Sequence, residues 1–250
     1  NLTFANLKCG VTIGFVTLVS QMKKLLGIMV LGLLLGGKVY GADINHCSVA
    51  SGDIDGTSSG SPLDNTYTCQ DDQTFVLDED EYVSGDSARI TASNDNLTIN
   101  ISGNLLATGN GNVITGTSFD TVAITNQSTG LIKGTTNGIK LDRGDAGTID
   151  NYGDIYAVSA KTINNTGADN TQITNRSGAK IRTDGQNAIL VQNGTGSNAS
   201  ETITVDNYGD ITAKYNAIKL GGSATGVTIN NYSGATIEAT DTDNDNTNAK

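Results

Sequence analysis

The chain is poor in the residue types that many enzyme sites need. Among its 250 residues it has one histidine, three cysteines and no tryptophan, and only 16% are charged. A Ser-His-acid set needs a histidine to take the proton from the nucleophile, and the single one, His46, has no visible partner set. One histidine and two cysteines that can pair do not make a tetrahedral zinc site. The sequence therefore predicts no catalytic residue, no metal site and no cofactor.

The low charge does not make this a disordered sequence. It comes with 31 glycines and with Ile and Val residues spaced between turn formers. Disordered chains usually carry more charge and fewer β-branched residues. Short apolar runs separated by Gly, Asn, Asp and Ser are typical of many short strands.

Basic residues are scarce as well. The formal net charge is −11, and residues 1–41 contain four bases and no acid, which leaves 11 bases against 26 acids in the remainder. A surface with a charge of −15 repels phosphate backbones, so we expect no nucleic-acid partner. Such a surface suits a soluble, self-repelling extracellular protein.

The main apolar run is short for a membrane span. It extends from Leu25 to Gly37, 13 residues, whereas a spanning helix needs about 20. Met22-Lys23-Lys24 precedes the run and KVYGA follows it, which is the pattern of a basic n-region, an apolar h-region and a cleavage site. We predict a signal peptide over 22–41, read by the Sec translocon and cut between Gly41 and Ala42; a retained transmembrane helix is the competing interpretation.

Residues 1–21 precede this signal and begin with Asn1. Three origins fit them: sequence translated upstream of the true start, an extended signal region, or part of a second apolar span. We assign them no role in the folded protein.

Cys47 and Cys69 are the two cysteines of the mature part, since Cys9 lies in the upstream extension. Two cysteines in an exported chain suggest one disulfide, which would close a Gly- and Ser-rich stretch. Two free thiols are the alternative.

A repeat with a period of about 24 residues runs through the second half of the chain. Five segments share an apolar residue, one intervening residue and then Asn, with steps of 25, 24, 32 and 24 residues; a weaker copy at Ile99 lies 25 residues before the first. The apolar members are Ile99, Ile124, Ile149, Ile173, Val205 and Ile229, and the asparagines are Asn126, Asn151, Asn175, Asn207 and Asn231. The long step contains NGTGSNASE (193–201), which we interpret as a surface loop.

A second apolar position follows each asparagine after a corner that contains glycine. These residues are Ile132, Ile155, Ile181, Ile211 and Ile237, and a further short strand such as NGIKL or NAILV comes next. A unit of two or three such strands cannot bury its own apolar face, but stacked units bury a continuous core. A propeller blade needs about 40–45 residues, so the period counts against a propeller. The sequence thus predicts an all-β, right-handed parallel β-helix of about 5–7 coils.

Stacking also accounts for the asparagines and glycines. An asparagine amide can bond the equivalent amide in the coils above and below, forming a ladder. Asparagine tolerates a turn conformation, and the following glycine is expected to supply positive φ. Tyr152, Tyr208 and Tyr232 each follow a ladder asparagine, so we predict an exterior aromatic stripe, with glycan contact as a hypothesis because exposed aromatic residues can bind ligands.

The repeated apolar-x-Asn-x-x-Gly-x-Ile units behind a Sec-type signal resemble the β-helical passenger domains of Gram-negative autotransporters. The resemblance covers about residues 95–250. It implies a non-enzymatic, adhesin-like or structural protein at the outer-membrane surface or outside the cell, with a cell-surface glycan or protein as ligand. In that family a C-terminal β-barrel, the link to the outer membrane, follows the passenger. We therefore expect an N-terminal fragment of a longer protein, with a complete protein and an acidic tail as the alternative.

The expected organisation has four parts. Residues 1–21 are the extension, 22–41 the signal peptide, 42–95 an irregular N-terminal cap with early strands at 75–77 and 88–91, and 96–250 the β-helix repeats.

A polysaccharide-active β-helix enzyme is the second hypothesis. Such enzymes place carboxylates and basic residues along one face, and the candidates are Asp142, Arg143, Asp145, Asp150 and Asp154. A solvated turn rich in Asp and Gly explains DRGD (142–145) equally well. DTDNDN (241–246) has the start of a calcium loop but lacks its glycine, and RGD (143–145) is too short to define an integrin site.

Overall fold

The structure is a computed structural model of the whole chain, and it describes residues 47–49, 66–79, 81–86, 89–93, 96–192, 202–222, 224 and 226–241. Compactness divides the chain into Asn1–Ile44 and Asn45–Lys250, and every described residue belongs to the second unit. The extension 1–21, the signal peptide, its cleavage site at Gly41 and Ala42, His46 and the loop 193–201 lie outside the described residues.

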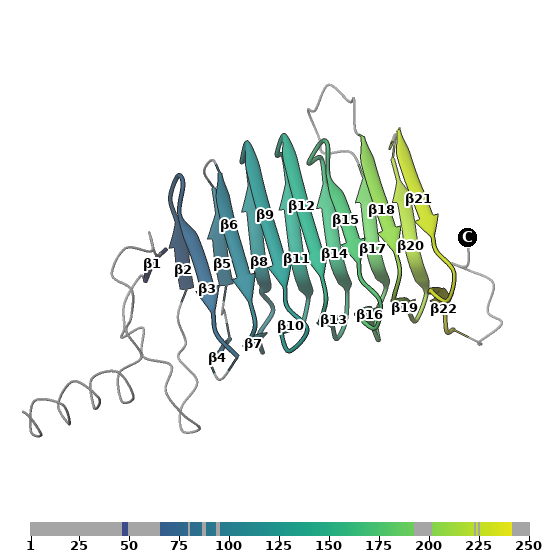
Figure 1. Ribbon diagram of the computed structural model, residues 1–250, viewed down its shortest axis with the longest axis horizontal. Helices are drawn as coiled ribbons and strands as arrows, with labels where there is room; N and C mark the ends of the chain where they lie inside the picture. Colours follow the sequence, from purple (N-terminus) through teal and green to yellow (C-terminus); the bar gives the residue numbers. More distant parts are fainter. Residues whose placement is uncertain are drawn as a thin grey trace, which may run out of the picture. The chain divides into compact units, whose positions relative to one another are not determined.

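The described residues form twenty-two strands in three sheets and contain no helix (Figure 1). Accordingly, none of the described ranges holds a helix long and apolar enough to cross a membrane.

Sheet A holds the strands that carry the predicted apolar-x-Asn motif. Its members are β3 (Thr74–Leu77), β6 (Leu97–Ile101), β9 (Thr121–Asn126), β12 (Ala146–Asn151), β15 (Gln172–Asn175), β18 (Ile203–Asn207) and β21 (Val227–Asn231). All neighbouring strands of this sheet are parallel.

Sheet C holds the strands that follow the glycine corner, again all parallel. Its members are β4 (Tyr82–Gly85), β7 (Asn104–Ala107), β10 (Leu131–Gly134), β13 (Asp154–Ala157), β16 (Lys180–Thr183), β19 (Asp210–Ala213) and β22 (Thr236–Ala239).

Sheet B completes each turn and is parallel except at its first pair, where β1 and β2 are antiparallel. Its members are β1 (Ser48–Val49), β2 (Thr66–Cys69), β5 (Arg89–Ala92), β8 (Asn112–Thr117), β11 (Asn137–Asp142), β14 (Lys161–Thr166), β17 (Asn187–Gln192) and β20 (Asn216–Gly221).

The chain visits the sheets in the order A, C, B. It makes six complete turns from β3 to β20, and β21 and β22 begin a seventh. The predicted all-β parallel β-helix of 5–7 coils is therefore confirmed. Register is kept across the long step, because Val205 pairs with Ile173 even though 193–201 intervenes between β17 and β18.

Three columns of apolar side chains fill the interior. Sheet A contributes Phe75, Ile99, Ile124, Ile149, Ile173, Val205 and Ile229 in register. Sheet C contributes Val83, Leu105, Ile132, Ile155, Ile181, Ile211 and Ile237. Sheet B contributes Tyr67, Ile90, Ile114, Ile139, Ile163, Ile189 and Ile218.

Two predicted core positions differ in burial from the rest. Ile229 is 40% exposed and Ile237 only partly buried, although their neighbours Val205 and Ile211 are fully buried. Both lie in the last described coil, where no described strand stacks on their outer side. Ile229 is therefore a position of the column but not a buried core residue of the described structure.

The first coil begins earlier than the sequence boundary at residue 96. Strands β3, β4 and β5 already stack in register on β6, β7 and β8. Their sequences depart from the Asn-Gly pattern, but β3 keeps the alternation of buried and half-buried residues. Regular stacking needs that alternation rather than the asparagine, because the alternation buries one face.

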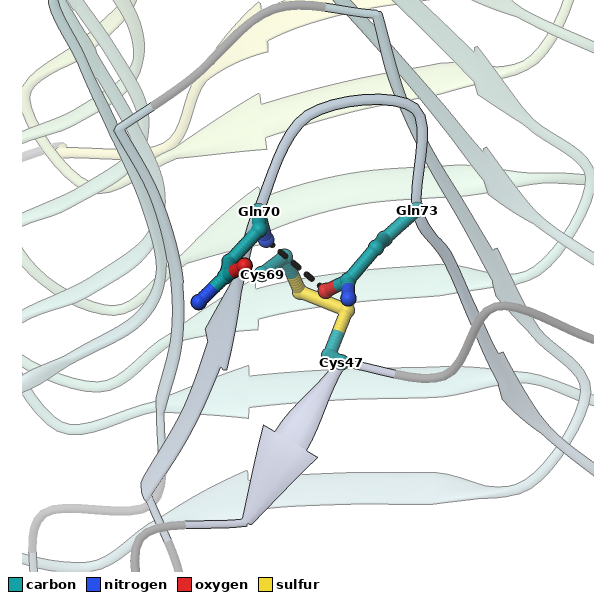
Figure 2. The surroundings of a disulfide bond; sticks show 4 residues. All are labelled: Cys47, Cys69, Gln70 and Gln73. Carbon is teal, nitrogen blue, oxygen red and sulfur yellow. Dashed lines mark hydrogen bonds between the residues drawn. A yellow bond between two sulfur atoms is a disulfide. The ribbon is translucent and has the colours of Figure 1, made fainter.

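The beginning of the stack is closed by a disulfide between Cys47 and Cys69 (Figure 2). Both half-cystines are buried in the core, and the buried ring of Tyr67 packs edge-on against Phe75 at 5.0 Å between centroids. The turn after Cys69 is held by a hydrogen bond from Gln70 N to Gln73 Oε1 at 2.8 Å. The disulfide thus ties β1 to β2 over the first coil.

Candidate binding surface

The asparagines that end the sheet A strands form a continuous hydrogen-bonded ladder. Each Nδ2 donates to Oδ1 of the next asparagine at 2.8–2.9 Å, from Asn126 through Asn151, Asn175 and Asn207 to Asn231. Each of the first four also donates to a backbone carbonyl of the next coil, and each of these four is fully buried. The ladder fixes the corner between sheets A and C, because a buried amide without partners destabilises the fold.

The ladder has a definite start. Asn126 Oδ1 is buried and receives no hydrogen bond, because the preceding coil has Ile101 at this position. The asparagine ladder therefore begins two strands later than the core column of sheet A, which already contains Phe75 and Ile99.

The glycines of the two DNYGDI corners have a different role from the one expected. Neither Gly153 nor Gly209 has φ in the left-handed region. A Cβ on Gly153 would lie 2.3 Å from Gly130 O, and one on Gly209 would lie 2.4 Å from Ala179 O. Close approach between successive coils is what requires glycine here. Positive φ occurs instead in the longer Ser-Gly corners, at Gly178 (φ +80) and Gly234 (φ +85).

A second asparagine ladder, at the start of the sheet B strands, was missed by the sequence analysis. Asn137 Nδ2 donates to Asn112 Oδ1, and Asn216 Nδ2 donates to Asn187 Oδ1. Lys161 occupies the position between Asn137 and Asn187 and interrupts the ladder. Asn137 Oδ1 is consequently buried without a hydrogen-bond partner. The first residue of NGIKL, NAILV and NAIKL carried the available signal.

The residue that follows each ladder asparagine lies on the outer corner between sheets A and C. These residues are Gln127, Tyr152, Arg176, Tyr208 and Tyr232, and we call them the corner stripe. The backbone amide of each donates to the coil before it at 2.7–2.9 Å, so they stack in register. The predicted tyrosine stripe is therefore interrupted, because Arg176 lies between Tyr152 and Tyr208.

The ring faces of the corner-stripe tyrosines contact other residues of the stripe. Tyr208 and Tyr232 stack with centroids 4.1 Å apart and planes 4° from parallel, and the Arg176 guanidinium lies 5.3 Å from the Tyr152 centroid. The three rings are still about two-fifths exposed. The groups that a ligand meets are therefore ring edges, hydroxyls and the guanidinium rather than a flat aromatic platform.

Carboxylates on sheet A hold the corner stripe in place. Arg176 makes a two-pronged ion pair with Asp150, with N–O distances of 2.6 and 2.9 Å, and the hydrogen bond to this carboxylate raises the pKa of Arg176. Tyr232 Oη donates to Asp206 Oδ1 at 3.3 Å. A hydrogen bond with Tyr208 is the main cause that raises the pKa of Tyr232 to about 12, so its hydroxyl is a neutral donor at physiological pH.

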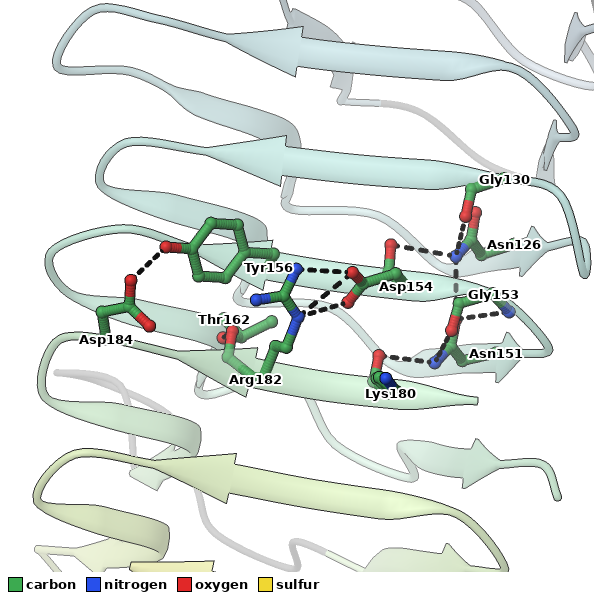
Figure 3. Close-up of polar contacts among 10 residues, drawn as sticks. All are labelled: Asn126, Gly130, Asn151, Gly153, Asp154, Tyr156, Thr162, Lys180, Arg182 and Asp184. Atoms are coloured by element: carbon green, nitrogen blue, oxygen red, sulfur yellow. Dashed lines mark hydrogen bonds and ion pairs between the residues drawn. The ribbon is translucent and has the colours of Figure 1, made fainter. Parts of the chain in front are cut away.

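A second polar cluster covers the outer face of sheet C (Figure 3). Arg182 pairs with Asp154 at 2.7 Å and lies over the Tyr156 ring at 4.2 Å, while Lys133 lies 5.4 Å from that ring's centroid. Tyr156 Oη donates to Asp184. Burial, followed by this hydrogen bond, raises the pKa of Tyr156, and the hydrogen bond to Asp154 raises the pKa of Arg182. Sequence analysis missed this cluster, although Lys133, Tyr156 and Arg182 each follow a core isoleucine.

The acids proposed for the enzyme hypothesis do not converge on one face. Asp142 and Asp145 flank the corner before β12, whereas Asp154 begins β13 after the far end of β12. Asp150 and Asp154 are engaged by Arg176 and Arg182 respectively, and Asp142 lies 3.4 Å from Lys140 Nζ and 3.7 Å from Arg143 Nε.

The remaining sequence candidates are surface features. Arg143, in the RGD triplet, has φ of 55° and an exposed side chain. Of the DTDNDN stretch only Asp241 belongs to the described residues. Among the residues that the structure describes, no three His, Cys, Asp or Glu side chains are grouped so that they could hold a metal ion.

Comparison with known proteins gives no match to a protein-family model, to a curated protein or to a solved structure.

Proposed function

We propose that the chain is an exported, non-enzymatic β-solenoid with an adhesin-like role, whose corner stripe contacts a glycan at a cell surface. The exposed, rigidly held stripe is the observation that carries this proposal. Its outward groups are phenol hydroxyls, a guanidinium and the amide of Gln127, bordered by the carboxylates of Asp150 and Asp206. Alternating donors and acceptors at the coil spacing suit a hydroxyl-rich chain ligand, because such a ligand can donate to and accept from each coil in turn.

Rigidity supports the same proposal. Ordering a long side chain on binding carries an entropic penalty. Arg176 is already fixed by two hydrogen bonds to Asp150, and Tyr208 is fixed by the stacked ring of Tyr232. The stripe is thus preorganised before any ligand arrives.

Binding of the purified chain to an array of neutral and acidic glycans tests the ligand class. We expect glycan binding that weakens in Tyr208→Ser and Arg176→Ser and persists in Tyr82→Ser. Tyr82 is a matched control because it is 42% exposed, against 39% for Tyr208, and lies on sheet C away from the stripe. Binding only to protein-coated surfaces would show that the ligand is a protein and not a glycan. Equal loss in Tyr82→Ser would refute the role of the stripe.

Export and the absence of catalysis have separate tests. We expect antibody against residues 66–241 to label intact cells that express the chain, as the resemblance to autotransporter passengers implies; labelling only after lysis would contradict export. Incubation with polysaccharides should release no reducing or unsaturated sugar ends. Turnover that disappears in Asp142→Asn or Arg143→Ala would favour the polysaccharide-active enzyme instead.

A further inference from the structure

Tyr208 and Tyr232 make the closest aromatic contact among the described residues. Their ring centroids lie 4.1 Å apart with the planes 4° from parallel, whereas Tyr67 and Phe75 meet edge-on at 5.0 Å. Parallel rings at such a separation are in van der Waals contact, so ring carbons of one tyrosine already touch the other ring. No other two tyrosines that the structure describes share a ring contact.

Both rings are open to solvent because they lie on the outer corner. Tyr208 is 39% and Tyr232 is 40% exposed. Tyr152, in the same stripe but with further coils on both sides of it, is 41% exposed. The exposure of the pair therefore belongs to the corner and does not depend on Tyr232 lying in the last described coil. A small reagent in solution reaches the edges of both rings.

Tyrosine is the side chain that the described residues offer most readily to an oxidant. Thiols and thioethers are ordinarily oxidised first. However, Met22 and Met29 lie outside the described ranges, the described cysteines Cys47 and Cys69 are already joined as a disulfide, and the chain has no tryptophan. A one-electron oxidant that meets this part of the chain therefore reacts with its phenols.

Tyr232 also has an acceptor in place for the proton that its oxidation releases. Its Oη donates to Asp206 Oδ1 at 3.3 Å, and Asn230 Nδ2 donates to the same oxygen at 2.9 Å, which fixes the carboxylate. A phenol gives up an electron more readily when its proton passes at the same time to a hydrogen-bonded base. The stacked pair thus combines ring contact, access from solvent and a proton acceptor.

We propose that Tyr208 and Tyr232 are a site of oxidative cross-linking, at which hydrogen peroxide, used by a peroxidase-type oxidant, joins the two rings through ortho carbons. Each phenol loses one electron and one proton; the proton of Tyr232 passes to Asp206 and that of Tyr208 to water. The two unpaired electrons form the carbon–carbon bond. The displaced ortho hydrogens then move to the phenol oxygens as both rings regain aromaticity. Overall, peroxide takes up two electrons and two protons and leaves as two molecules of water.

The new bond joins two successive coils at their shared corner. The rings can turn to form it, because the χ2 torsion of tyrosine has a broad range. A covalent link between Tyr208 and Tyr232 restricts the unfolded chain as a disulfide does, but it is not opened by thiols. The cross-link does not depend on glycan binding by the corner stripe.

Oxidation of the purified full chain with a peroxidase and hydrogen peroxide tests the proposal. Lys214 and Lys219 lie between the two tyrosines, so trypsin separates the tyrosines after unfolding unless they are cross-linked. We expect a monomer whose digest contains a joined peptide, two hydrogens lighter than its parts. Its yield should be roughly tenfold or more above that of any other tyrosine pair, because these partners are held in contact. The yield should not change when the protein is diluted.

Two variants and an unfolded sample serve as controls. Tyr208→Phe keeps a ring in the stack and should abolish the joined peptide. Tyr152→Phe should leave its yield unchanged, since Tyr152 is equally exposed but faces Arg176. Oxidation in urea should remove the preference for this pair. Tyrosine oxidation without the Tyr208–Tyr232 link, a link formed only between molecules, or equal yields from folded and unfolded chains would each overturn the proposal.

Discussion

The two ends of the described stack are built from the same columns but finished differently. At the beginning, Phe75, Val83 and Tyr67 start the three columns and all three are buried, and a disulfide links β2 to the residue before β1 at the same end. At the other end, Ile229, Ile237 and Ile218 continue the same columns and are exposed or partly buried. The difference lies in what covers each end, because the register is identical. A repeat protein whose units contact only their neighbours should therefore have unequal stability along its length.

The largest expected loss of stability comes from truncating the sheet A column near its beginning rather than at its last described residue. Ile99→Ala should lower the free energy of unfolding by about 2–5 kcal/mol, the range for truncating a fully buried isoleucine. Ile229→Ala should lower it by roughly 1 kcal/mol or less, because much of that side chain already contacts water. Urea unfolding of both variants measures the difference. Equal losses would mean that the two ends are equally covered.

Removing the disulfide should weaken the covered end. The double variant Cys47→Ser/Cys69→Ser should lose about 2–4 kcal/mol, because the disulfide restricts the unfolded chain. Hydrogen exchange should accelerate first in β2, β3 and β5. The β20–β22 amides, at the open end, are the control. Uniform acceleration would show that the stack unfolds as one unit and that its ends are not independent.

The ladder offers a third comparison with identical side chains. Asn151→Leu should lower the free energy of unfolding by about 2–3 kcal/mol. It removes one acceptor of Asn126 Nδ2 and the side-chain donor to the buried Asn175 Oδ1 and to Lys180 O. Asn231→Leu should change it by less than about 0.5 kcal/mol, as expected for an exposed position. Thermal or urea unfolding distinguishes the two. A large effect at Asn231 would indicate that this end is buried in solution.

The fold could be predicted from the sequence because coil stacking repeats the same requirement every turn. Ile124, Ile149 and Ile173 recur at steps of 24–25 residues, and that period reports a column directly. The first coil at β3–β5 was placed in the cap because it lacks the asparagine, although β3 already alternates buried and half-buried residues. The exposure of Ile229 depends on whether another strand stacks on its outer side. The repeat pattern around Ile229 carries no information about that strand.

The candidate surface was less predictable, because its chemistry depends on neighbours one coil away. The tyrosines at 152, 208 and 232 are visible in the sequence, but Arg176 joins their row only when the coils are aligned. The cluster of Lys133, Tyr156 and Arg182 likewise needs the register of sheet C. The corner glycines were predicted to supply positive φ. At Gly153, however, glycine is required because a side chain would collide with the backbone of the preceding coil.

A single substitution should join the two separate parts of the second asparagine ladder. Lys161 separates the Asn112–Asn137 pair from the Asn187–Asn216 pair of the second ladder. Lys161→Asn should supply a donor to the unpaired Asn137 Oδ1 and accept from Asn187, which we expect to stabilise the fold by about 1 kcal/mol. Lys161→Gln is the control for loss of charge. If both variants are equally stable, charge removal rather than ladder completion explains the gain.

The smallest effect concerns the tyrosine pair at the open end and depends on pH. The pKa of Tyr232 is raised to about 12, first by its hydrogen bond with Tyr208, whereas an unfolded tyrosine ionises near pH 10. Between these values the unfolded chain loses the proton first, so this contribution to stability is complete below about pH 10 and is lost as the pH rises through the folded pKa. Tyrosinate absorbance of the folded Tyr156→Phe variant, which removes the other tyrosine whose pKa is raised, should show a late-titrating group, and adding Tyr208→Phe should return it toward about pH 10. If the late titration is unchanged by Tyr208→Phe, the raised pKa of Tyr232 comes from Asp206. The contact that holds Tyr232 would then be the carboxylate on sheet A and not the neighbouring tyrosine of the corner stripe.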